Sequence, residues 1–458
     1  MLSALKRLAP KPLLQAYHWA LSLLAAAWYA WPSKRMVVIG VTGTNGKTTV
    51  VNLIARILEE AGEKVGLTST VNFRIAGEEK LNDMKMTMPG RFFLQKMLHR
   101  MAEAGCRFAV IETSSQGLEQ HRHLGVEYDV AVFTNLTPEH IEAHGGFANY
   151  KAAKLKLFRH LTRQARKSIP MRGDVKKVAV VNLESEHAWD FLDAPADKKY
   201  GFLADGSEKG AGKAAWPMAV VKALDVKLEA DGSSFVVRET RFNLKMPGRY
   251  NVLNALAAIS VGLSQGVPLE TMARALAKVD NVPGRFERID EGQDFAVIVD
   301  YAPEPESLRQ VYAAIDRMPR KRLIHVLGSA GGGRDVARRP ILGCMAGEHA
   351  DIAIVTNEDP YDDDPSVIIG HVAAGALEAG KKEGETLFKI DDRREAIRKA
   401  VSLAGPGDVV LLTGKGAEQA IVGRGGRLSP WDERSVAREL LRERLDASHV
   451  VRERRGKV

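Results

Sequence analysis

The feature that most constrains this chain is a glycine-rich turn between a strand-like run and a helix-like run. The β-branched run Met36–Val41 comes first, and the turn Thr42–Thr49 (TGTNGKTT) follows it. After the turn, the apolar residues of TVVNLIARILEEAG recur at helical spacing up to a glycine. A strand that enters a helix through such a turn predicts a phosphate-binding loop in a parallel α/β sheet.

The turn carries the chemical groups that bind a nucleotide phosphate. Its glycines let backbone N–H groups approach phosphate oxygens, and the start of the following helix favours negative charge. Lys47 can reach the terminal phosphates, and the hydroxyl of Thr48 can ligate Mg²⁺. The spacing departs from the standard motif, because Val41 stands where the first glycine would be. The expected nucleotide-binding residues of this loop are Gly43, Thr44, Asn45, Gly46, Lys47, Thr48 and Thr49.

Further β-branched runs alternate with helical patterns along the chain. They cover residues 108–111, 130–133, 178–181, 297–299, 323–327, 352–355 and 409–412. This alternation predicts an α/β fold with parallel sheets. We expect a phosphate-loop parallel-sheet central domain, a Rossmann-like C-terminal α/β domain and a short N-terminal helix.

Two breaks in the pattern indicate the domain organisation. Residues 198–244 alternate and turn at Asp231-Gly232, as a β insertion would. The proline and glycine of Asn281–Arg285 (NVPGR) are typical of a linker. We therefore expect an N-terminal apolar helix in residues 1–35, a central nucleotide-binding domain in 36–282 and a C-terminal domain in 283–458.

Composition excludes several classes of protein. The 458 residues are 45% hydrophobic and 27% charged, which is ordinary for a globular chain of about three domains. Aromatic residues make up only 6% and do not interleave with the Lys and Arg residues, so no nucleic-acid partner is expected. The two cysteines, Cys106 and Cys344, cannot form a disulfide framework or a four-thiolate zinc site. A reducing, cytoplasmic compartment is the natural setting.

The N-terminal segment is unusually apolar. Residues 13–31 reach the length of a short membrane span and are flanked by basic residues, although Gln15, His18 and Ser22 weaken that interpretation. Signal cleavage is not expected, because the run leads directly into a strand. Two alternatives remain open: a helix packed on the body of the protein, and a monotopic helix with Trp and Tyr at the lipid interface. The second would place the protein at the cytoplasmic face of a membrane by peripheral contact.

Several motifs, in order and at similar spacing, resemble those of the Mur ligases. TGTNGKTT resembles the phosphate loop of Mur ligases and folylpolyglutamate synthetases. The MurE-like segments are Glu112–Leu118 (ETSSQGL) with Gln120 and Arg122, Thr134–His140 (TNLTPEH), Tyr150–Lys154 (YKAAK), Pro247–Asn254, Pro283–Glu287, Asp300–Ala302, Gly331–Asp335 and Gly414–Glu418. The chain is therefore similar to MurE-like Mur ligases. Only about 35 residues precede the first strand, so we expect the usual N-terminal UDP-binding domain of these ligases to be missing. The UDP-sugar would then bind differently, or the acceptor would be another molecule.

The resemblance implies roles for individual residues. It implies ATP and Mg²⁺ as cofactors, with Glu112, His140 and a carbamylated Lys154 joining Thr48 around the metal. Taken alone, a histidine here is more often a capping or core residue, and a lysine is more often solvated. The implied catalytic residues are Lys47, Glu112, His140 and Lys154. ATP would be bound by Asn251, Arg285 and Asp300. The acceptor would be bound by Thr87, Ser114, Gln120 and Arg122. The amino acid would be bound by Arg334, Gly414 and Glu418.

The activity implied is ATP-dependent amide-bond formation in peptidoglycan precursor synthesis. An amino acid would be added to the carboxylate of UDP-N-acetylmuramoyl-dipeptide through an acyl phosphate. Two departures from the family stand out: Pro303 replaces the histidine of D-Y-A-H, and Tyr361 replaces the arginine of D-N-P-R in diaminopimelate-adding enzymes. The acidic run 362–364 would suit a cationic side chain such as lysine, or is solvated surface. The rivals are a folylpolyglutamate- or cyanophycin-synthetase-like ligase and a catalytically inactive nucleotide-binding scaffold.

Overall fold

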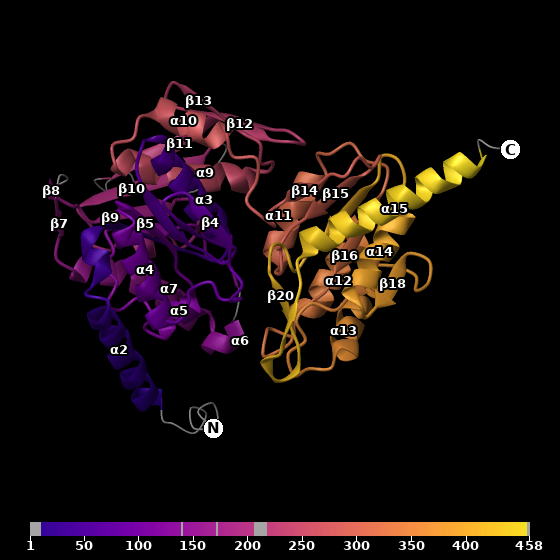
Figure 1. The fold of residues 1–458 in the computed structure, drawn as a ribbon, viewed down its shortest axis with the longest axis horizontal. Helices are drawn as coiled ribbons and strands as arrows, with labels where there is room; N and C mark the ends of the chain where they lie inside the picture. Colours follow the sequence, from indigo (N-terminus) through magenta and orange to yellow (C-terminus); the bar gives the residue numbers. More distant parts are fainter. Residues whose placement is uncertain (1–10, 139–140, 171–172, 206–217, 456–458) are drawn as a thin grey trace.

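The computed structural model describes residues 11–138, 141–170, 173–205 and 218–455 (Figure 1). Two α/β bodies lie side by side. The indigo-to-magenta part of the chain forms one body, and the orange-to-yellow part forms the other. The predicted α/β fold class is confirmed.

The first body is built on one large mixed sheet. Its strand order is β13-β12-β11-β10-β9-β6-β1-β5-β2-β3-β4. The strands are β1 (Val37–Thr42), β2 (Val65–Thr68), β3 (Asn72–Ile75), β4 (Glu78–Leu81), β5 (Phe108–Glu112), β6 (Val130–Phe133), β9 (Val178–Asn182), β10 (Lys198–Ala204), β11 (Ala219–Leu228), β12 (Ser233–Val237) and β13 (Thr240–Leu244). A separate short pair is formed by β7 (Ser168–Ile169) and β8 (Gly173–Asp174).

The central strands are parallel and buried on both faces. In β1, Val37, Ile39 and Val41 belong to one hydrophobic core, whereas Val38 belongs to the core on the other face. Side chains alternate between the two faces of a strand, so a continuous apolar run is what a doubly covered sheet needs. Val41 of β1 pairs with Glu112 of β5, which brings the ends of these two strands to the same edge.

The segment 198–244 extends this sheet. Strand β10 pairs in parallel with β9 and with β11, and β12 then pairs antiparallel with β11. The backbone N–H of Glu229 donates to the carbonyl of Gly232 in the turn between β11 and β12. Strands β11, β12 and β13 therefore lie at one edge of the main sheet.

Helices cover both faces of the first sheet. Helices α3 (Lys47–Glu60), α9 (Arg249–Ser264) and α10 (Leu269–Ala277) pack on one face. Helices α4 (Arg91–Glu103), α7 (Phe147–Arg163) and α8 (Ala188–Leu192) pack on the other, beside the short α5 (Ser115–Glu119) and α6 (Ile141–His144). The N-terminal helix α2 (Lys11–Trp28) is followed by the turn η1 (Pro32–Arg35) and packs beside α4. Among the described residues, no helix combines the length and apolarity that crossing a bilayer requires.

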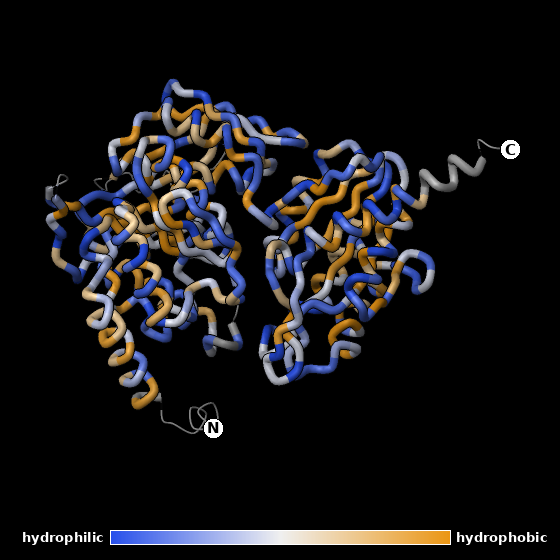
Figure 2. Tube along the Cα trace, in the orientation of Figure 1, coloured by the Kyte–Doolittle hydropathy of each residue, from blue (hydrophilic) through white to orange (hydrophobic). Residues whose placement is uncertain are grey.

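The second body has a six-stranded sheet of order β14-β15-β19-β16-β17-β18. Its strands are β14 (Glu287–Ile289), β15 (Ala296–Val299), β16 (Leu323–Leu327), β17 (Ile352–Thr356), β18 (Leu387–Ile390) and β19 (Val409–Leu412). All but β14 run parallel, and Figure 2 shows these strands as orange, hydrophobic segments. Helices α11 (Pro305–Ile315), α12 (Arg338–His349) and α13 (Pro365–Glu378) cover one face, and α14 (Arg393–Leu403) and α15 (Glu433–Arg455) cover the other. A small ribbon of β20 (Ala420–Val422), η3 (Arg424–Gly426) and β21 (Leu428–Pro430) completes the body.

The passage between the two bodies lies between α10 and β14. Val282 and Arg285 form an isolated bridge there, which tightens the turn around Gly284. We keep 1–35, 36–282 and 283–458 as the proposed division of the chain.

Candidate functional site

A cavity of about 990 Å³ lies where the first sheet meets the second body. It opens at the carboxyl ends of parallel strands, where α/β folds bind ligands. The predicted site residues that line it are Thr44, Asn45, Gly46, Lys47, Thr48, Thr49, Thr87, Glu112, Ser114, Gln120, Arg122, Lys154, Asn251, Arg285, Asp300 and Arg334. Gly43, Gly414 and Glu418 do not line it, and His140 lies outside the described residues.

The glycine-rich loop is fixed by close packing and by hydrogen bonds. Gly46 has a φ of 82°, and a Cβ there would lie 2.3 Å from Oδ1 of Asn254. Only glycine fits this combination of backbone angle and close approach. On the opposite side, Thr134 Oγ1 donates to the carbonyl of Asn45 at 2.6 Å, and the N–H of Asn45 donates to Asn135 Oδ1 at 2.9 Å. The loop is thus held in shape at the N-terminus of α3.

Thr48 and Glu112 meet below this loop. The Thr48 hydroxyl donates to both carboxylate oxygens of Glu112, at 3.0 and 3.1 Å. Glu112 is buried, and it also accepts from the backbone N–H and the hydroxyl of Thr70 at 2.7 and 2.9 Å. Hydroxyl and carboxylate oxygens are the hard donors that Mg²⁺ prefers. Thr70 was not predicted, and its place between two strands gives no local signal.

Two lysines are directed at the carbonyl oxygens of the loop. Lys47 Nζ donates to the carbonyl of Thr44, and Lys154 Nζ donates to the carbonyl of Gly43, both at 2.6 Å. Lys154 is buried, and its ammonium lies 4.3 Å from the ring centre of Tyr150. The phenol oxygen of Tyr150 is 3.0 Å from Thr44 Oγ1. Lys154 is therefore not the solvated surface lysine of the simpler alternative.

Further polar residues line the cavity beside α5. Ser114 caps this helix by accepting from the N–H of Gly117 at 3.1 Å. The side-chain oxygen of Gln120 accepts from Arg122 Nε and Nη2 at 3.1 and 2.6 Å. Burial lowers the pKa of Arg122 to about 10, and the nearby Arg91 adds to this effect. The hydroxyl oxygens of Thr70 and Thr87 also lie 2.9 Å apart, so this wall is rich in hydrogen-bonding groups.

The second body contributes cationic and anionic groups. Arg285 Nη2 donates to the Thr48 hydroxyl at 3.3 Å, and its guanidinium lies 4.6 Å from the ring centre of Tyr301. Asp300 accepts from the N–H of Phe286 at 2.6 Å. Burial raises the pKa of Asp300, and Arg285 opposes this rise. The structure thus brings the predicted Arg285 and Asp300 to the phosphate loop, although more than two hundred residues separate them from it in the sequence.

Asn251 lies at the start of α9. Its side-chain amide donates to the carbonyl of Pro247 at 2.8 Å, and its oxygen accepts from Asn254 at 3.2 Å. Asn254 in turn contacts Gly46. The loop and the nucleotide-contacting segment predicted around Asn251 therefore form one packed unit.

Glu418 belongs to a buried network of charges behind the cavity wall. Its carboxylate lies 2.7 Å from Lys415 Nζ and 3.1 Å from Lys85 Nζ, and both lysines also pair with Asp359. Burial lowers the pKa of Lys85, whereas the carboxylates of Glu418 and Asp359 oppose this shift. Lys85 and Asp359 were not predicted, and the ion pairs of Lys85 join the two bodies. Nothing in the sequence around Lys85 indicates such a contact.

Gly414 packs against a buried carboxyl group. A Cβ at Gly414 would lie 2.5 Å from Oε2 of Glu358, and the N–H of Gly414 donates to the carbonyl of Tyr301 at 2.8 Å. Burial raises the pKa of Glu358 to about 7, partly offset by Arg338. Gly414 therefore shapes the base of the site without opening to the cavity.

Tyr361 lies in the cavity beside Arg334. Its backbone is left-handed, with φ 55°, and a Cβ at Gly332 would lie 2.5 Å from its ring. The acidic residues that follow have contacts of their own. Asp362 accepts from the N–H of Gly425, Asp363 pairs with Arg339 at 3.1 Å, and Asp364 caps α13 through the N–H of Ser366. None of the three lines the cavity, which favours the interpretation of residues 362–364 as solvated surface.

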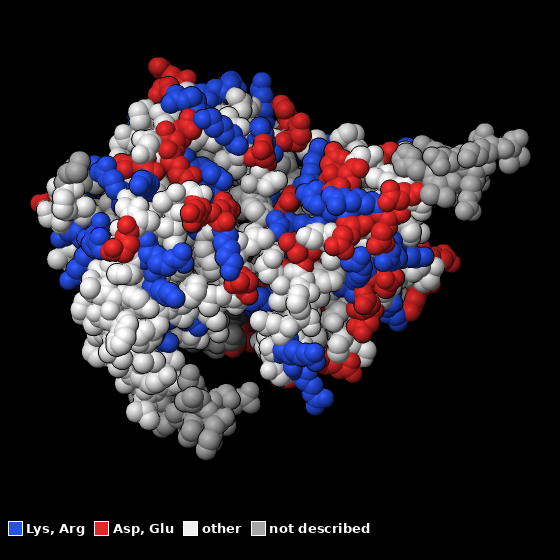
Figure 3. Space-filling model, viewed as in Figure 1, with Lys and Arg blue, Asp and Glu red and all other residues white. Residues whose placement is uncertain are grey.

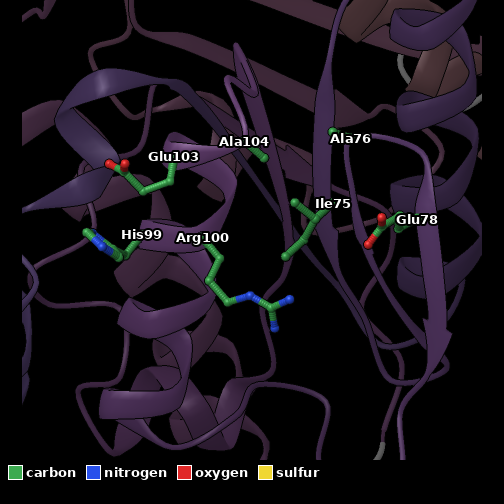
Figure 4. Close-up of a pocket in the computed structure, with 7 residues that line it drawn as sticks. All are labelled: Ile75, Ala76, Glu78, His99, Arg100, Glu103 and Ala104. Carbon is green, nitrogen blue, oxygen red and sulfur yellow. The ribbon is translucent and has the colours of Figure 1, made fainter.

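A second hollow, of about 510 Å³, lies between α4 and the β3–β4 edge of the sheet (Figure 4). It is lined by Ile75, Ala76, Glu78, His99, Arg100, Glu103 and Ala104. It contains no predicted site residue, and Glu103 is already paired with Arg35 at 2.6 Å. The larger cavity is therefore the candidate active site.

A phosphate loop, a buried carboxylate beside its threonine and charged groups from a second α/β body define a nucleotide-dependent α/β enzyme with a site between two bodies. The Mur ligase middle domain matches residues 41–262, and the Mur ligase, glutamate ligase domain matches residues 284–416. The chain belongs to the Mur ligase family, whose members are ATP-dependent ligases that form amide bonds.

Individual relatives agree with this assignment. The chain is 42% identical to the UDP-N-acetylmuramyl-tripeptide synthetase of Roseiflexus sp. (strain RS-1), over 93% of this chain and 82% of the relative. It is 38% identical to the UDP-N-acetylmuramoyl-L-alanyl-D-glutamate--2,6-diaminopimelate ligase of Syntrophomonas wolfei, with the same shares covered. A solved diaminopimelate ligase of that name is 28% identical, with a TM-score of 0.56 over 90% of this chain and 79% of that one.

More distant structures share the fold. MurF from Acinetobacter baumannii has a TM-score of 0.62 at 19% identity, over 94% of this chain and 80% of its own. Folylpolyglutamate synthase from Mycobacterium tuberculosis, solved with ADP, has a TM-score of 0.65 at 18% identity, over 89% and 93%.

Proposed function

We propose that this chain adds an amino acid to the peptide carboxylate of UDP-N-acetylmuramoyl-dipeptide, with ATP cleaved to ADP and phosphate. The observation that carries the proposal is that one cavity, of about 990 Å³, holds the phosphate loop, the polar wall beside α5 and Arg334 of the second body. A ligase needs a nucleotide, an acceptor carboxylate and an amine within reach of one another. The names of the relatives supply the acceptor.

The residues of the loop fit a nucleotide triphosphate. Backbone N–H groups at the start of α3 would bind phosphate oxygens, and Lys47 would leave the Thr44 carbonyl to reach the terminal phosphates. Arg285 already contacts Thr48 from the second body, so it would add positive charge on the opposite side. Asn251 and Asp300 are proposed to hold the rest of the nucleotide from α9 and from the end of β15.

The oxygen donors beside the loop fit Mg²⁺. Thr48 and Glu112 provide a hydroxyl and a buried carboxylate about 3 Å apart. The described residues contain no cluster of three or more His, Cys, Asp or Glu side chains that could hold a metal. Mg²⁺ commonly uses only one or two protein carboxylates together with substrate phosphates, so this small set is sufficient. The metal would neutralise charge on the phosphates, and His140 and a carbamylated Lys154 stay proposed ligands.

The reaction proposed has two steps. The acceptor carboxylate attacks the γ-phosphorus of ATP, which gives an acyl phosphate and ADP. The neutral amine of the amino acid then attacks the acyl carbon, phosphate leaves and an amide forms. Lys47 and Arg285 would stabilise the charge that develops on the transferred phosphoryl group.

Binding of the two remaining substrates is assigned to opposite walls. Ser114, Gln120, Arg122 and Thr87 would hold the acceptor on the wall beside α5, where they line the cavity. Arg334 would contact the amino acid from the second body. Gly414 and Glu418 would act from behind that wall, and Glu418 would receive the amino group once Lys85 has moved. The predicted contact of residues 13–31 with a membrane is no part of this chemistry and is a separate proposal.

The test is the dependence of ADP formation on both organic substrates. ADP should form only when UDP-N-acetylmuramoyl-L-alanyl-D-glutamate and a suitable amino acid are present together. Lys47→Ala should abolish turnover, because the terminal phosphates lose their cation, whereas Lys80→Ala at an exposed site should leave it unchanged. Glutamate-extended folate as a better acceptor would favour the folylpolyglutamate-like rival, and ATP binding without turnover on any acceptor would favour the scaffold.

A further inference from the structure

The N-terminal helix α2 presents its apolar side chains to the outside. Leu13, Tyr17, Leu24 and Trp28 are 64%, 43%, 54% and 74% exposed. Their positions are separated by four, seven and four residues, which places them along one stripe of the helix. An ordinary surface helix buries its large apolar side chains, whereas α2 buries small residues such as Ser22 and Ala26 and leaves this stripe exposed.

Polar contacts and small residues fix that orientation. Ser22, on the inner side of α2, donates to the carbonyls of His18 and His121 at 2.9 and 2.8 Å. Arg91 of α4 donates to the Ser22 hydroxyl at 2.9 Å and to the His18 carbonyl at 3.1 Å. A Cβ at Gly125 would lie 2.6 Å from the Cβ of Ala26, so the helix approaches the body closely at this point. Rotating the helix to bury Leu13 and Trp28 would break these contacts.

The exposed apolar surface continues around the stripe. Trp19 of α2 is 53% exposed, and Phe92 of the neighbouring α4 is 41% exposed. Figure 3 shows predominantly white atoms over α2 at the lower left of the molecule, and Figure 2 shows orange segments along the helix. A surface that combines Trp, Tyr, Phe and Leu is typical of contact with the interface of a bilayer.

The charge of the N-terminal region indicates which surface it meets. Residues 1–35 contain Lys6, Arg7, Lys11, Lys34 and Arg35, and the first acidic residue of the chain is Glu59. Lys34 and Arg35 already pair with Glu127 and Glu103 on the body. The three basic residues at the start of the chain precede the apolar stripe directly in sequence. Basic residues beside an exposed apolar helix attract anionic lipid headgroups.

We propose that α2 docks this protein onto an anionic lipid surface, lying in the plane of the interface with Leu13, Tyr17, Leu24 and Trp28 in contact with the lipid. The helix would then hold the body of the enzyme at the membrane surface. A second copy of the chain could also cover this stripe. However, α2 has no acidic residue that could pair with the basic residues beside the stripe of such a copy.

The test is co-sedimentation of the full chain with vesicles of phosphatidylcholine alone and of phosphatidylcholine mixed with phosphatidylglycerol. We expect the chain to bind the anionic vesicles, and we expect salt to weaken this binding. Binding to neutral vesicles should be weaker by about fivefold for each basic residue that reaches the surface. The variant Leu13→Gln, Tyr17→Gln, Leu24→Gln, Trp28→Gln should stay in the supernatant and keep its ATP-dependent turnover.

The matched control replaces four exposed apolar residues of the second body: Val336→Gln, Ile341→Gln, Val367→Gln and Leu377→Gln. This control should still sediment with anionic vesicles. Equal binding to neutral and anionic vesicles would contradict the proposal, as would equal loss of binding in both variants. A lipid-free dimer that dissociates only in the α2 variant, with no vesicle binding by the wild type, would show that the stripe joins two copies.

Discussion

The ammonium of Lys85 lies 3.1 Å from the carboxylate of Glu418, and it pairs with Asp359 as well. Lys85 belongs to the first body, and both carboxylates belong to the second. The side chain of Lys85 is only 7% exposed, so these ion pairs are largely shielded from water. The ammonium of Lys85 is thus already paired with the Glu418 carboxylate, which is proposed to bind the amino group of the incoming amino acid.

Replacing Lys85 should therefore help the amino acid to bind. In Lys85→Met the competing ammonium is absent, and the KM for the amino acid should fall by about tenfold, while the KM for ATP changes little. Steady-state kinetics with each substrate varied in turn would measure this. Lys80→Met, at an exposed site in the same segment, serves as the control. A higher KM for the amino acid in Lys85→Met would mean that Lys85 assists binding.

Replacing Lys154 should remove the metal ligand that its carbamylated side chain is proposed to supply. Lys154→Ala should reduce turnover strongly, and short-chain carboxylic acids should restore part of it by replacing a carbamate at the metal. Intact-protein mass spectrometry at neutral pH with bicarbonate should show the added mass of one carbon dioxide in the wild type only. Full activity of a wild-type preparation with unmodified Lys154 would leave the residue as a support of the Gly43 carbonyl.

Tyr361 should influence which amino acid is accepted. Tyr361→Arg would place a guanidinium beside Arg334, where it could pair bidentately with the distal carboxylate of diaminopimelate. The ratio of kcat/KM for diaminopimelate to that for lysine should rise by at least about tenfold, the range of a charge-assisted contact. Tyr361→Phe keeps the ring against Gly332 and should leave the ratio unchanged. An equal ratio in all three proteins would place the distal end of the amino acid elsewhere.

Glu358 should make stability fall as the pH rises. Its pKa is about 7 in the folded protein against an ordinary 4.5, because burial disfavours the charged form. Between these two pH values the native state holds more protons than the unfolded state, so the free energy of unfolding decreases with rising pH, by at most about 3 kcal/mol. Glu358→Gln should remove this decrease. Urea unfolding of both proteins at pH 5 and at pH 7.5 would measure this change in the free energy of unfolding. An equal change with pH in the wild type and in Glu358→Gln would contradict the raised pKa of Glu358.

Local sequence signals predicted the strand, the glycine-rich turn and the helix around Lys47 at their observed places. The β-branched run of β1, the glycines and the helix that begins at Lys47 are neighbours in sequence, so their geometry follows from short-range rules. Other features depend on partners far away. The contact of Lys85 with Asp359 joins residues 274 positions apart, and nothing near Lys85 encodes it.

The edge of the first sheet illustrates the same limit. Alternation and the Asp231-Gly232 turn predicted a β insertion, whereas the parallel pairing of β10 with β9 and β11 is what makes it part of the main sheet. Likewise, the contacts of Asp363 with Arg339 and of Asp364 with Ser366 explain an acidic run that the sequence left open. Pairing partners, rather than residue types, decide both cases.

The most direct test of the central claim follows an oxygen label from the acceptor. UDP-N-acetylmuramoyl-L-alanyl-D-glutamate labelled with ¹⁸O in its carboxylates would be incubated with ATP, Mg²⁺, the enzyme and single amino acids. The account predicts a product with the mass of the amide adduct and one ¹⁸O atom in the phosphate released, because the carboxylate attacks the γ-phosphorus. Absence of the adduct, or an adduct accompanied by unlabelled phosphate, would contradict it.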